Sequence, residues 1–228
     1  MTTEQPGILV LPGAGSFGSE LTPLLDELGA AAKIARYPGR FGRDFGKETT
    51  FAEIVDACAD QARKLPAERV ILAGHSFGAY VAHATAAELE RRRIPVDALV
   101  VAGANAPRLL TVPQDAVSDR PAVAAYLERI DPHLLPDPSD EWHDVVLDAA
   151  LQDLRLLAHY STTPPPHPRC PVFAARGATD PLTSGEGIRE WADATTGPCA
   201  HRTFPGGHSD LLTTAAFADW LRTAARHT

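Results

Sequence analysis

Residues 70–80 have the sequence Val70-Ile71-Leu72-Ala73-Gly74-His75-Ser76-Phe77-Gly78-Ala79-Tyr80. A short apolar run ends at a glycine, and a segment compatible with a helix begins at the serine two residues later. The pattern G-x-S-x-G predicts a strand, a sharp turn and a helix, with the serine hydroxyl standing clear of the sheet edge. The glycines allow the strand and the helix to pass close to the turn. Ser76 is therefore our candidate nucleophile, and the alternative is a serine that caps an ordinary glycine-flanked turn.

The composition limits the class of protein. A chain of 228 residues with 44% hydrophobic residues is long enough, and apolar enough, to fold around one sizeable core. The formal net charge of −8 argues against a general affinity for nucleic acid or anionic membranes. Residues 1–6 carry no basic region, and no apolar run approaches transmembrane length. Three widely spaced cysteines indicate neither a disulfide framework nor a zinc site. We expect a single domain over residues 1–228, cytoplasmic and without a metal.

Strand and helix patterns alternate along most of the chain. Apolar runs predict strands over Ile8–Leu11, Ala30–Ala35, Val70–Ala73, Ala98–Ala102, Val172–Ala175 and Ala200–Phe204. Apolar residues at helical spacing predict helices over Glu20–Leu28, Phe51–Leu65, Phe77–Arg92, Gly185–Ala194 and Leu211–Arg226. This alternation predicts an α/β fold, in which a mostly parallel sheet is covered by helices on both faces.

The alternation breaks between residues 107 and 160. This insertion is rich in proline, aspartate and leucine, with helical pieces over Ala122–Ile130 and Trp142–Tyr160. We interpret it as a helical lid over the C-terminal edge of the sheet, where open α/β sheets bind ligands. The apolar residues of this insertion exceed what a solvated connector needs, so we expect some of them to line an acyl-binding chamber and others to hold the lid together. They include Leu109, Leu110, Leu134, Leu135, Trp142, Leu147, Leu151 and Leu154.

A serine nucleophile needs a base within hydrogen-bond reach, and the base needs a carboxylate that fixes its tautomer. Asp180 lies just past one predicted strand and His208 just past the next, in the order serine, acid, histidine that follows this type of turn. The alternatives are a helix-capping aspartate and a satisfied loop histidine. Asp193 and the lid aspartates are weaker candidates for the acid. His75, inside the turn, is expected to pack or to bond locally.

The loop Pro12-Gly13-Ala14-Gly15-Ser16 joins the first predicted strand to the first predicted helix. It carries neither a G-x-G-x-x-G pattern nor a Walker lysine, so a phosphate cradle is not indicated. In chains with this serine turn, such a loop supplies one backbone N–H of an oxyanion hole, and the residue after the nucleophile supplies the other. We assign these two donors to Ala14 and Phe77. The alternative is that Gly13 and Gly15 merely form a tight turn.

Four stretches together resemble the type II thioesterases, the stand-alone editing hydrolases of polyketide and nonribosomal peptide synthesis, which belong to the α/β-hydrolase superfamily. Leu11-Pro12-Gly13-Ala14-Gly15 resembles the P-H-A-G-G loop of that family, and Arg36-Tyr37-Pro38-Gly39-Arg40 its Y-P-G-R signature. Gly74-His75-Ser76-Phe77-Gly78-Ala79 resembles its G-H-S-M-G-A turn. Asp180-Pro181 and Gly206-Gly207-His208 resemble its acid and base loops. The resemblance spans nearly the whole chain.

The resemblance implies a substrate and a mechanism. The substrate would be an acyl thioester on the phosphopantetheine arm of an acyl or peptidyl carrier protein, and the enzyme would need no cofactor of its own. Ser76 would attack the carbonyl with His208 as general base, and water would then release a free acid. The sequence departs from the family at Gly13, where a histidine is usual, and at Ser209-Asp210, where an aromatic pair commonly follows the base.

The same sequence features also fit other functions. A carboxylesterase or lipase would use the same three residues on oxygen esters. A chain-releasing or cyclising thioesterase would form a lactone or a macrocycle. A catalytically silent binding protein is disfavoured because all three catalytic positions are filled.

The predicted partner is a carrier protein, and no nucleic acid or membrane partner is expected. Carrier proteins are usually acidic, as this chain is, so their encounter would need a local basic patch. We hypothesise a docking patch that uses some of Arg36, Arg40, Arg43 and Arg91–Arg93. The alternative is that these arginines form a solvated charged face. We favour a monomer.

Overall fold

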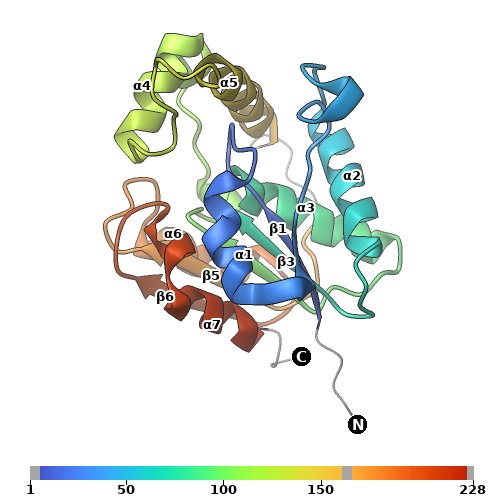
Figure 1. Cartoon of the computed structure of the whole chain (residues 1–228). Helices are drawn as coiled ribbons and strands as arrows, with labels where there is room; N and C mark the ends of the chain where they lie inside the picture. Colours follow the sequence, from blue (N-terminus) through green and yellow to red (C-terminus); the bar gives the residue numbers. More distant parts are fainter. Residues whose placement is uncertain (1–5, 161–165, 225–228) are drawn as a thin grey trace.

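Six parallel strands form the centre of the molecule in the order β2-β1-β3-β4-β5-β6 (Figure 1). The computed structural model describes residues 6–160 and 166–224. The strands are β1 Gly7–Leu11, β2 Ala32–Ile34, β3 Val70–His75, β4 Ala98–Ala102, β5 Val172–Gly177 and β6 Cys199–Phe204. All six predicted strands are therefore present, and the parallel sheet is confirmed.

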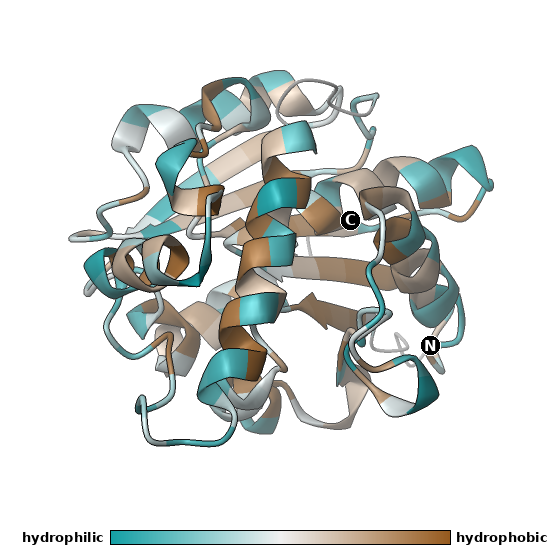
Figure 2. Cartoon of the chain, turned by 90° about the horizontal axis from the view of Figure 1, so that it is seen from above, coloured by the Kyte–Doolittle hydropathy of each residue, from teal (hydrophilic) through white to brown (hydrophobic). Residues whose placement is uncertain are grey.

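Helices cover both faces of the sheet, as predicted. On one face lie α2 Phe51–Arg63, α3 Phe77–Arg91 and α6 Gly185–Arg189, and on the other lie α1 Thr22–Leu28 and α7 Ala215–Ala224. Seen from above, the strands are mostly hydrophobic, whereas the loops and the outward helix faces carry the hydrophilic residues (Figure 2).

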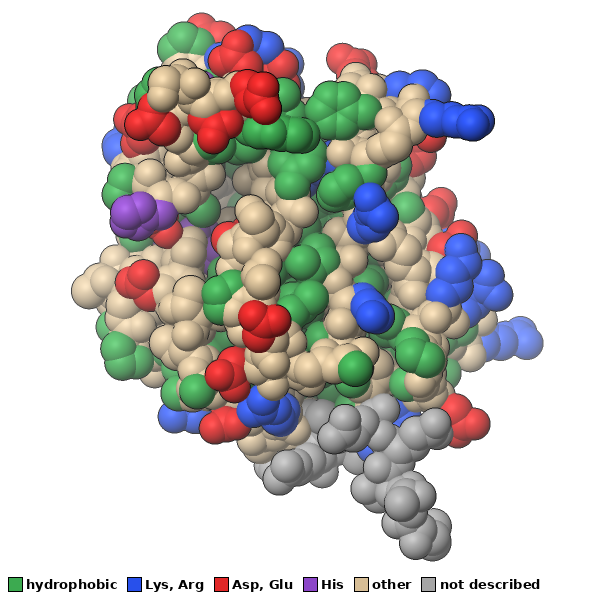
Figure 3. Space-filling model, in the orientation of Figure 1, with side chains coloured by type: hydrophobic (Ala, Val, Ile, Leu, Met, Phe, Trp, Pro, Cys, Tyr) green, Lys and Arg blue, Asp and Glu red, His purple; other side chains and the backbone are tan. Residues whose placement is uncertain are grey.

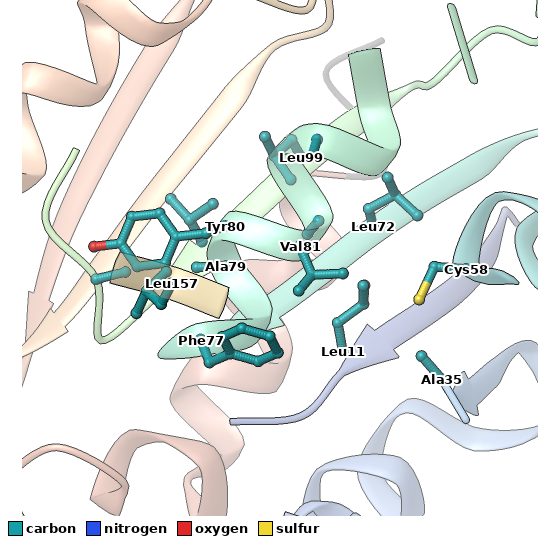
Figure 4. Packing of buried hydrophobic residues seen from close by; sticks show 14 of the residues in the cluster. Leu11, Ala35, Cys58, Leu72, Phe77, Ala79, Tyr80, Val81, Leu99 and Leu157 are labelled. Carbon is teal, nitrogen blue, oxygen red and sulfur yellow. The ribbon is translucent and has the colours of Figure 1, made fainter. Parts of the chain in front are cut away.

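Alternation along the strands divides the core into two halves. Successive side chains of a strand point to opposite faces, so Leu72 packs on the α3 side and Ile71 on the α1 side. On the α3 side, Leu11, Leu72 and Leu99 come from three neighbouring strands and pack around Val81 and Phe77 of α3 (Figure 4). Strand β3, which leads to Ser76, is thus packed on both faces of the sheet by buried residues.

Several predicted boundaries differ from the structure. β2 is shorter than the predicted 30–35 strand because a 3-10 turn, Gly29–Ala31, precedes it. The predicted loop over 40–50 contains a 3-10 turn, Gly42–Asp44. The helices predicted over 20–28 and 185–194 each combine an α-helix with a 3-10 turn, which is Ser19–Leu21 in the first and Glu190–Ala194 in the second.

The predicted C-terminal helix over 211–226 is also divided. A 3-10 turn, Asp210–Thr213, precedes α7, and the extended Thr214 between them accepts a hydrogen bond from the Phe217 N–H through its hydroxyl. This capping bond begins a new helix and so interrupts the predicted one. The end of the predicted helix, at residues 225 and 226, lies outside the described residues, as do residues 1–5 of the N-terminal segment that lacks a basic region.

The lid predicted between residues 107 and 160 contains two helices, α4 Arg120–Ile130 and α5 His143–Tyr160, which lie above the edge of the sheet (Figure 1). Two 3-10 turns, Pro107–Leu109 and Asp115–Val117, precede them. Within the described part of the chain, no helix combines the length and the apolar character needed to cross a bilayer. The single-domain interpretation of residues 1–228 stays a prediction.

Candidate active site

Ser76 occupies the sharp turn between β3 and α3. Its backbone has φ 54° and ψ −121°, and the one other non-glycine residue with positive φ in the described chain is Arg93. Such a conformation costs about 1–3 kcal/mol and persists only where the surroundings hold it. Here the Ser76 N–H donates to the Ala102 carbonyl (2.8 Å), and the Ser76 carbonyl accepts from the Ala79 N–H (3.0 Å). The backbone therefore fixes the direction in which the hydroxyl leaves the sheet.

The two glycines of the turn are required by the close approach of neighbouring backbone. A β-carbon on Gly74 would lie 2.2 Å from the Gly78 carbonyl oxygen, and one on Gly78 would lie 2.2 Å from the Leu11 carbonyl oxygen. Neither obstacle is a flexible side chain that could move aside. The pattern G-x-S-x-G thus packs α3 directly on the ends of β3 and β1.

The predicted acid and base lie together. Asp180 follows β5, His208 follows β6, and both side chains are almost fully buried. The His208 Nδ1 lies 3.1 Å from Asp180 Oδ2, and Asp180 also accepts from the Thr183 hydroxyl (2.7 Å) and the Leu182 N–H (2.9 Å). Burial favours a raised pKa for Asp180, but these hydrogen bonds outweigh it and lower the pKa. An ionised Asp180 places the proton of the neutral imidazole on Nδ1 and leaves Nε2 as an acceptor.

Ser76 and His208 line the same cavity. Among the residues that the structure describes, the Ser76 hydroxyl and the His208 Nε2 make no hydrogen bond, to each other or to a third group. Catalytic hydrogen bonds are often long in a structure without substrate and shorten when substrate binds. The structure therefore joins the acid to the base, whereas the bond between the nucleophile and the base stays a prediction.

His75 has a contact that its sequence position did not indicate. Its Nε2 donates to the backbone carbonyl of His208 (3.0 Å), and the two imidazole rings lie 4.7 Å apart. Burial lowers the pKa of His75 to about 3, so its ring is neutral near pH 7. The sequence predicts that His75 packs or bonds locally; it is indeed packed and buried, but its hydrogen-bond partner is 133 positions away. A pattern in one sequence carries no signal for such a contact, which ties the serine turn directly to the base loop.

The predicted oxyanion donors lie beside the nucleophile. A β-carbon on Gly13 would stand 3.5 Å from the Ser76 Cβ, so the loop that carries Ala14 passes directly over the serine. Phe77 is the first residue of α3, where a backbone N–H has no partner within its own helix. Within the described ranges, neither the Ala14 nor the Phe77 N–H donates a hydrogen bond. Both donors are thus free to bind an anion, and their role stays a prediction.

The Y-P-G-R stretch holds this loop at both ends. The Tyr37 hydroxyl donates to the Pro12 carbonyl (2.9 Å), and the Arg40 guanidinium donates to the Ser16 carbonyl. Arg40 also forms an ion pair with Asp153 of α5, and the two side chains are 7% and 3% exposed. Asp153 in turn accepts from the Gly15 N–H (2.8 Å). Burial raises the pKa of the Asp153 carboxyl, although Arg40 and the Gly15 N–H oppose that rise.

The docking patch predicted from the arginines is therefore wrong for Arg40, because a buried, paired guanidinium is not available to a partner protein. Arg91–Arg93 lie at the C-terminal end of α3. This end is far from Ser76, because a helix of 15 residues is about 22 Å long. Arg92 is moreover paired with Asp56, Asp60 and Glu88. Arg36 and Arg43 remain exposed on the loop that follows β2.

A cavity of about 1280 Å³ lies between the sheet edge and the lid, and the molecular surface is hollowed below the lid (Figure 3). Most of its lid-side lining is apolar: Leu109, Leu110, Val112, Leu127, Ile130, Leu134, Leu135, Leu154 and Leu157. Leu147 and Leu151, which we also expected as lining candidates, pack instead in the core. Phe45 and Trp142 line the cavity but are about half exposed (49% and 48%), so they mark its mouth.

These features match the requirements of acyl transfer. Ser76 on its strained turn, His208 of the buried His–Asp pair, and Ala14 and Phe77 with their unpaired N–H groups line one largely apolar cavity, and a serine hydrolase requires such parts. Within the described residues, no group of three or more His, Cys, Asp or Glu side chains is placed to hold a metal ion.

Comparisons with known proteins agree with this chemistry. A family model described as a thioesterase domain matches residues 7–225. The thioesterase PikA5 of Streptomyces venezuelae is 31% identical over 220 residues, which cover 88% of this chain and 74% of that protein. A Streptomyces griseus protein named "Probable cadicidin biosynthesis thioesterase" is 28% identical over 209 residues, and the match spans 88% of this chain but only 57% of that relative.

Among solved structures, the type II thioesterase BorB from the borrelidin biosynthetic cluster is 28% identical to this chain. The two superpose with a TM-score of 0.83 over 99% of this chain and 94% of that one. The predicted α/β-hydrolase fold is thereby confirmed.

Proposed function

Because this chain belongs to the thioesterase family, whose members cleave thioesters, we propose that it removes acyl groups from the phosphopantetheine arm of an acyl or peptidyl carrier protein. The role would be editing in polyketide or nonribosomal peptide synthesis, where BorB is named as a type II thioesterase. The observation that carries the proposal is the buried His208–Asp180 pair, whose His208 lines the same cavity as Ser76 on its strained turn.

The first half of the reaction transfers the acyl group to the enzyme. The Ser76 Oγ attacks the thioester carbonyl while its proton passes to His208 Nε2, and Asp180 stabilises the imidazolium. The N–H groups of Ala14 and Phe77 hold the oxyanion of the tetrahedral intermediate. The C–S bond then breaks, and the leaving thiolate takes the proton from His208. The acyl group is now an ester of Ser76.

The second half returns the free enzyme. His208 Nε2 takes a proton from a water molecule, whose oxygen attacks the ester carbonyl and regenerates the oxyanion. The C–O bond to Ser76 breaks, and its oxygen recovers a proton from the imidazolium. The product is a free carboxylic acid, and no cofactor takes part in any step.

The shape of the site supports an acyl substrate. The lid wall is apolar, so it favours a hydrocarbon chain over a charged or strongly hydrated one. The mouth at Phe45 and Trp142 gives access to the nucleophile from outside, as a substrate tethered to a carrier protein would need.

The proposal is tested with carrier proteins loaded with a panel of acyl groups and analysed by mass spectrometry before and after addition of the enzyme. We expect loss of the acyl mass, recovery of the free phosphopantetheine thiol and release of the acid, and none of these with Ser76→Ala. A matched p-nitrophenyl ester of the same acid is expected to turn over more slowly than the thioester.

Three outcomes would contradict it. Intact acyl carrier proteins after prolonged incubation would exclude this substrate class. Faster hydrolysis of the oxygen ester would favour a carboxylesterase. A product lighter than the acid by one water would indicate cyclisation.

A further inference from the structure

The lid wall of the cavity carries a phenol among mostly apolar side chains; the other polar lid residues of the lining are Thr111, Asp131, His133 and Asp140. In α4, the buried positions Val123, Tyr126, Leu127 and Ile130 follow helical spacing and form the inner face of the helix. Tyr126 is 9% exposed and lines the cavity together with Leu127 and Ile130.

The hydroxyl of Tyr126 has no hydrogen-bond partner among the described residues. By contrast, the other tyrosine of the cavity, Tyr80, donates to the Asn105 carbonyl (2.9 Å). A buried phenol usually has such a partner, because an unsatisfied one costs free energy. Nor is the Tyr126 oxygen sealed inside the protein, as the unpaired hydroxyls of Thr85 and Ser209 are. The Tyr126 oxygen is therefore accessible, and its side chain lines the cavity.

The surroundings keep this phenol neutral and near the reacting end of the cavity. Burial raises the pKa of Tyr126, so its proton is retained near pH 7 and the group both donates and accepts. The nearby charges are those of Arg129, whose guanidinium lies 5.7 Å from the ring centre, and Asp180, which is close enough to add to the rise in pKa. In Figure 1, α4 lies above the loops that follow β5 and β6, and these loops carry Asp180 and His208.

We propose that the Tyr126 hydroxyl binds an oxygen substituent of the acyl chain, a hydroxyl or keto group close to the thioester carbonyl, so that the enzyme favours oxygenated acyl groups over saturated ones. The inference rests on the proposed function and adds a substrate class to it. A site built to bond a substrate oxygen discriminates against the analogue that lacks it, because the protein group is then left unpaired.

The test compares N-acetylcysteamine thioesters of hexanoate, 3-hydroxyhexanoate and 5-hydroxyhexanoate. Wild-type enzyme is expected to prefer the 3-hydroxy compound. Tyr126→Phe should lower kcat/KM for that compound about 3- to 12-fold, the loss of one neutral hydrogen bond, and leave the hexanoate thioester unchanged. Tyr80→Phe is the matched control: its hydroxyl already has a protein partner, so the ratio between the two substrates should stay at the wild-type value.

The outcomes separate the two proposals. If wild-type enzyme cleaves none of the thioesters, the proposed function fails. If it cleaves them and Tyr126→Phe leaves the ratio of 3-hydroxyhexanoate to hexanoate unchanged, the role of Tyr126 is overturned while the proposed function stands. Inhibition of the wild-type enzyme by the free acids gives a readout without a variant, and equal inhibition by hexanoate and 3-hydroxyhexanoate would also overturn it.

Discussion

The two walls of the cavity are held in different ways. On the sheet wall, Ser76, Asp180 and His208 each follow the end of a strand, and the hydrogen-bonded ladder of the parallel sheet fixes their relative positions. On the lid wall, side-chain packing sets the positions. One buried ion pair, Arg40–Asp153, joins the lid to the loop after β2, and its two members also bind the backbone of Ser16 and Gly15 in the loop that carries Ala14. Backbone geometry therefore positions the candidate catalytic residues, whereas packed side chains shape the lid wall of the cavity.

Loss of the nucleophile tests the sheet wall and carries the largest expected effect. Ser76→Ala should lower kcat on a small acyl thioester by at least about 10,000-fold, as removal of a triad member typically does. The fold should persist, because the turn is held by backbone bonds and by the glycines at positions 74 and 78. Kinetics and circular dichroism check the two halves. Substantial activity in a folded variant would show that the chemistry does not depend on this serine.

The ion pair tests whether the lid merely covers the site or also holds it. Asp153→Leu alone should destabilise the fold by about 3–5 kcal/mol, because it leaves the Arg40 charge buried without a partner. The double variant Asp153→Leu/Arg40→Met replaces the pair with apolar groups, and stability should return close to wild type. The bonds to the Gly15 N–H and the Ser16 carbonyl stay absent.

We therefore expect kcat of the double variant to remain about 10- to 100-fold low, since the loop that carries Ala14 is then held at Pro12 but no longer at Gly15 and Ser16. Urea unfolding and steady-state kinetics, measured on the same preparations, separate the two effects. Recovery of kcat together with stability would mean that the pair stabilises the lid without positioning the oxyanion loop.

This contrast also explains what the sequence could predict. The strands, the turn glycines at positions 74 and 78, and the order of Ser76, Asp180 and His208 follow from local patterns. Their meeting at one edge follows because parallel strands bring their ends together there. In the sequence Arg40 is one of several docking candidates, and its pairing with Asp153 cannot be predicted, because the two residues lie 113 positions apart and no local pattern joins them. The contact from His75 to His208 escaped for the same reason. Hydrophobic periodicity also does not locate the helix break at Thr214, because this break depends on a hydrogen bond to one side-chain hydroxyl.

A lower pH should reduce the free energy of unfolding through two buried histidines, His75 of β3 and His83 of α3. His75 and His83 have pKa values lowered by burial to about 3 and about 4, whereas an unfolded chain binds these protons near pH 6.5. Because the unfolded state binds more protons, stability falls as the pH falls below 6.5. The two groups together should remove about 3 kcal/mol of unfolding free energy between pH 6.5 and 5.

Chemical denaturation across this pH range measures the loss. His83→Gln should roughly halve the slope, while His201→Gln, at an exposed position of β6, should leave it unchanged. A flat profile in wild-type protein would show that the histidines are not held neutral in the folded state.

The smallest expected effect concerns the mouth of the cavity, where the sheet wall and the lid wall meet. Arg43 is exposed on the loop whose neighbours Gly42 and Phe45 line the mouth of the cavity, whereas Arg93 is exposed beyond the far end of α3. If a carrier protein docks at the mouth, Arg43→Glu should raise KM for the carrier-bound substrate about 3-fold, the size expected of one solvated charge. KM for the N-acetylcysteamine thioester should not change, because that substrate has no protein to dock. Arg93→Glu is the matched control and should alter neither value. Equal effects of the two reversals on the carrier-bound substrate would mean that net charge, and not a contact at the mouth, governs the encounter.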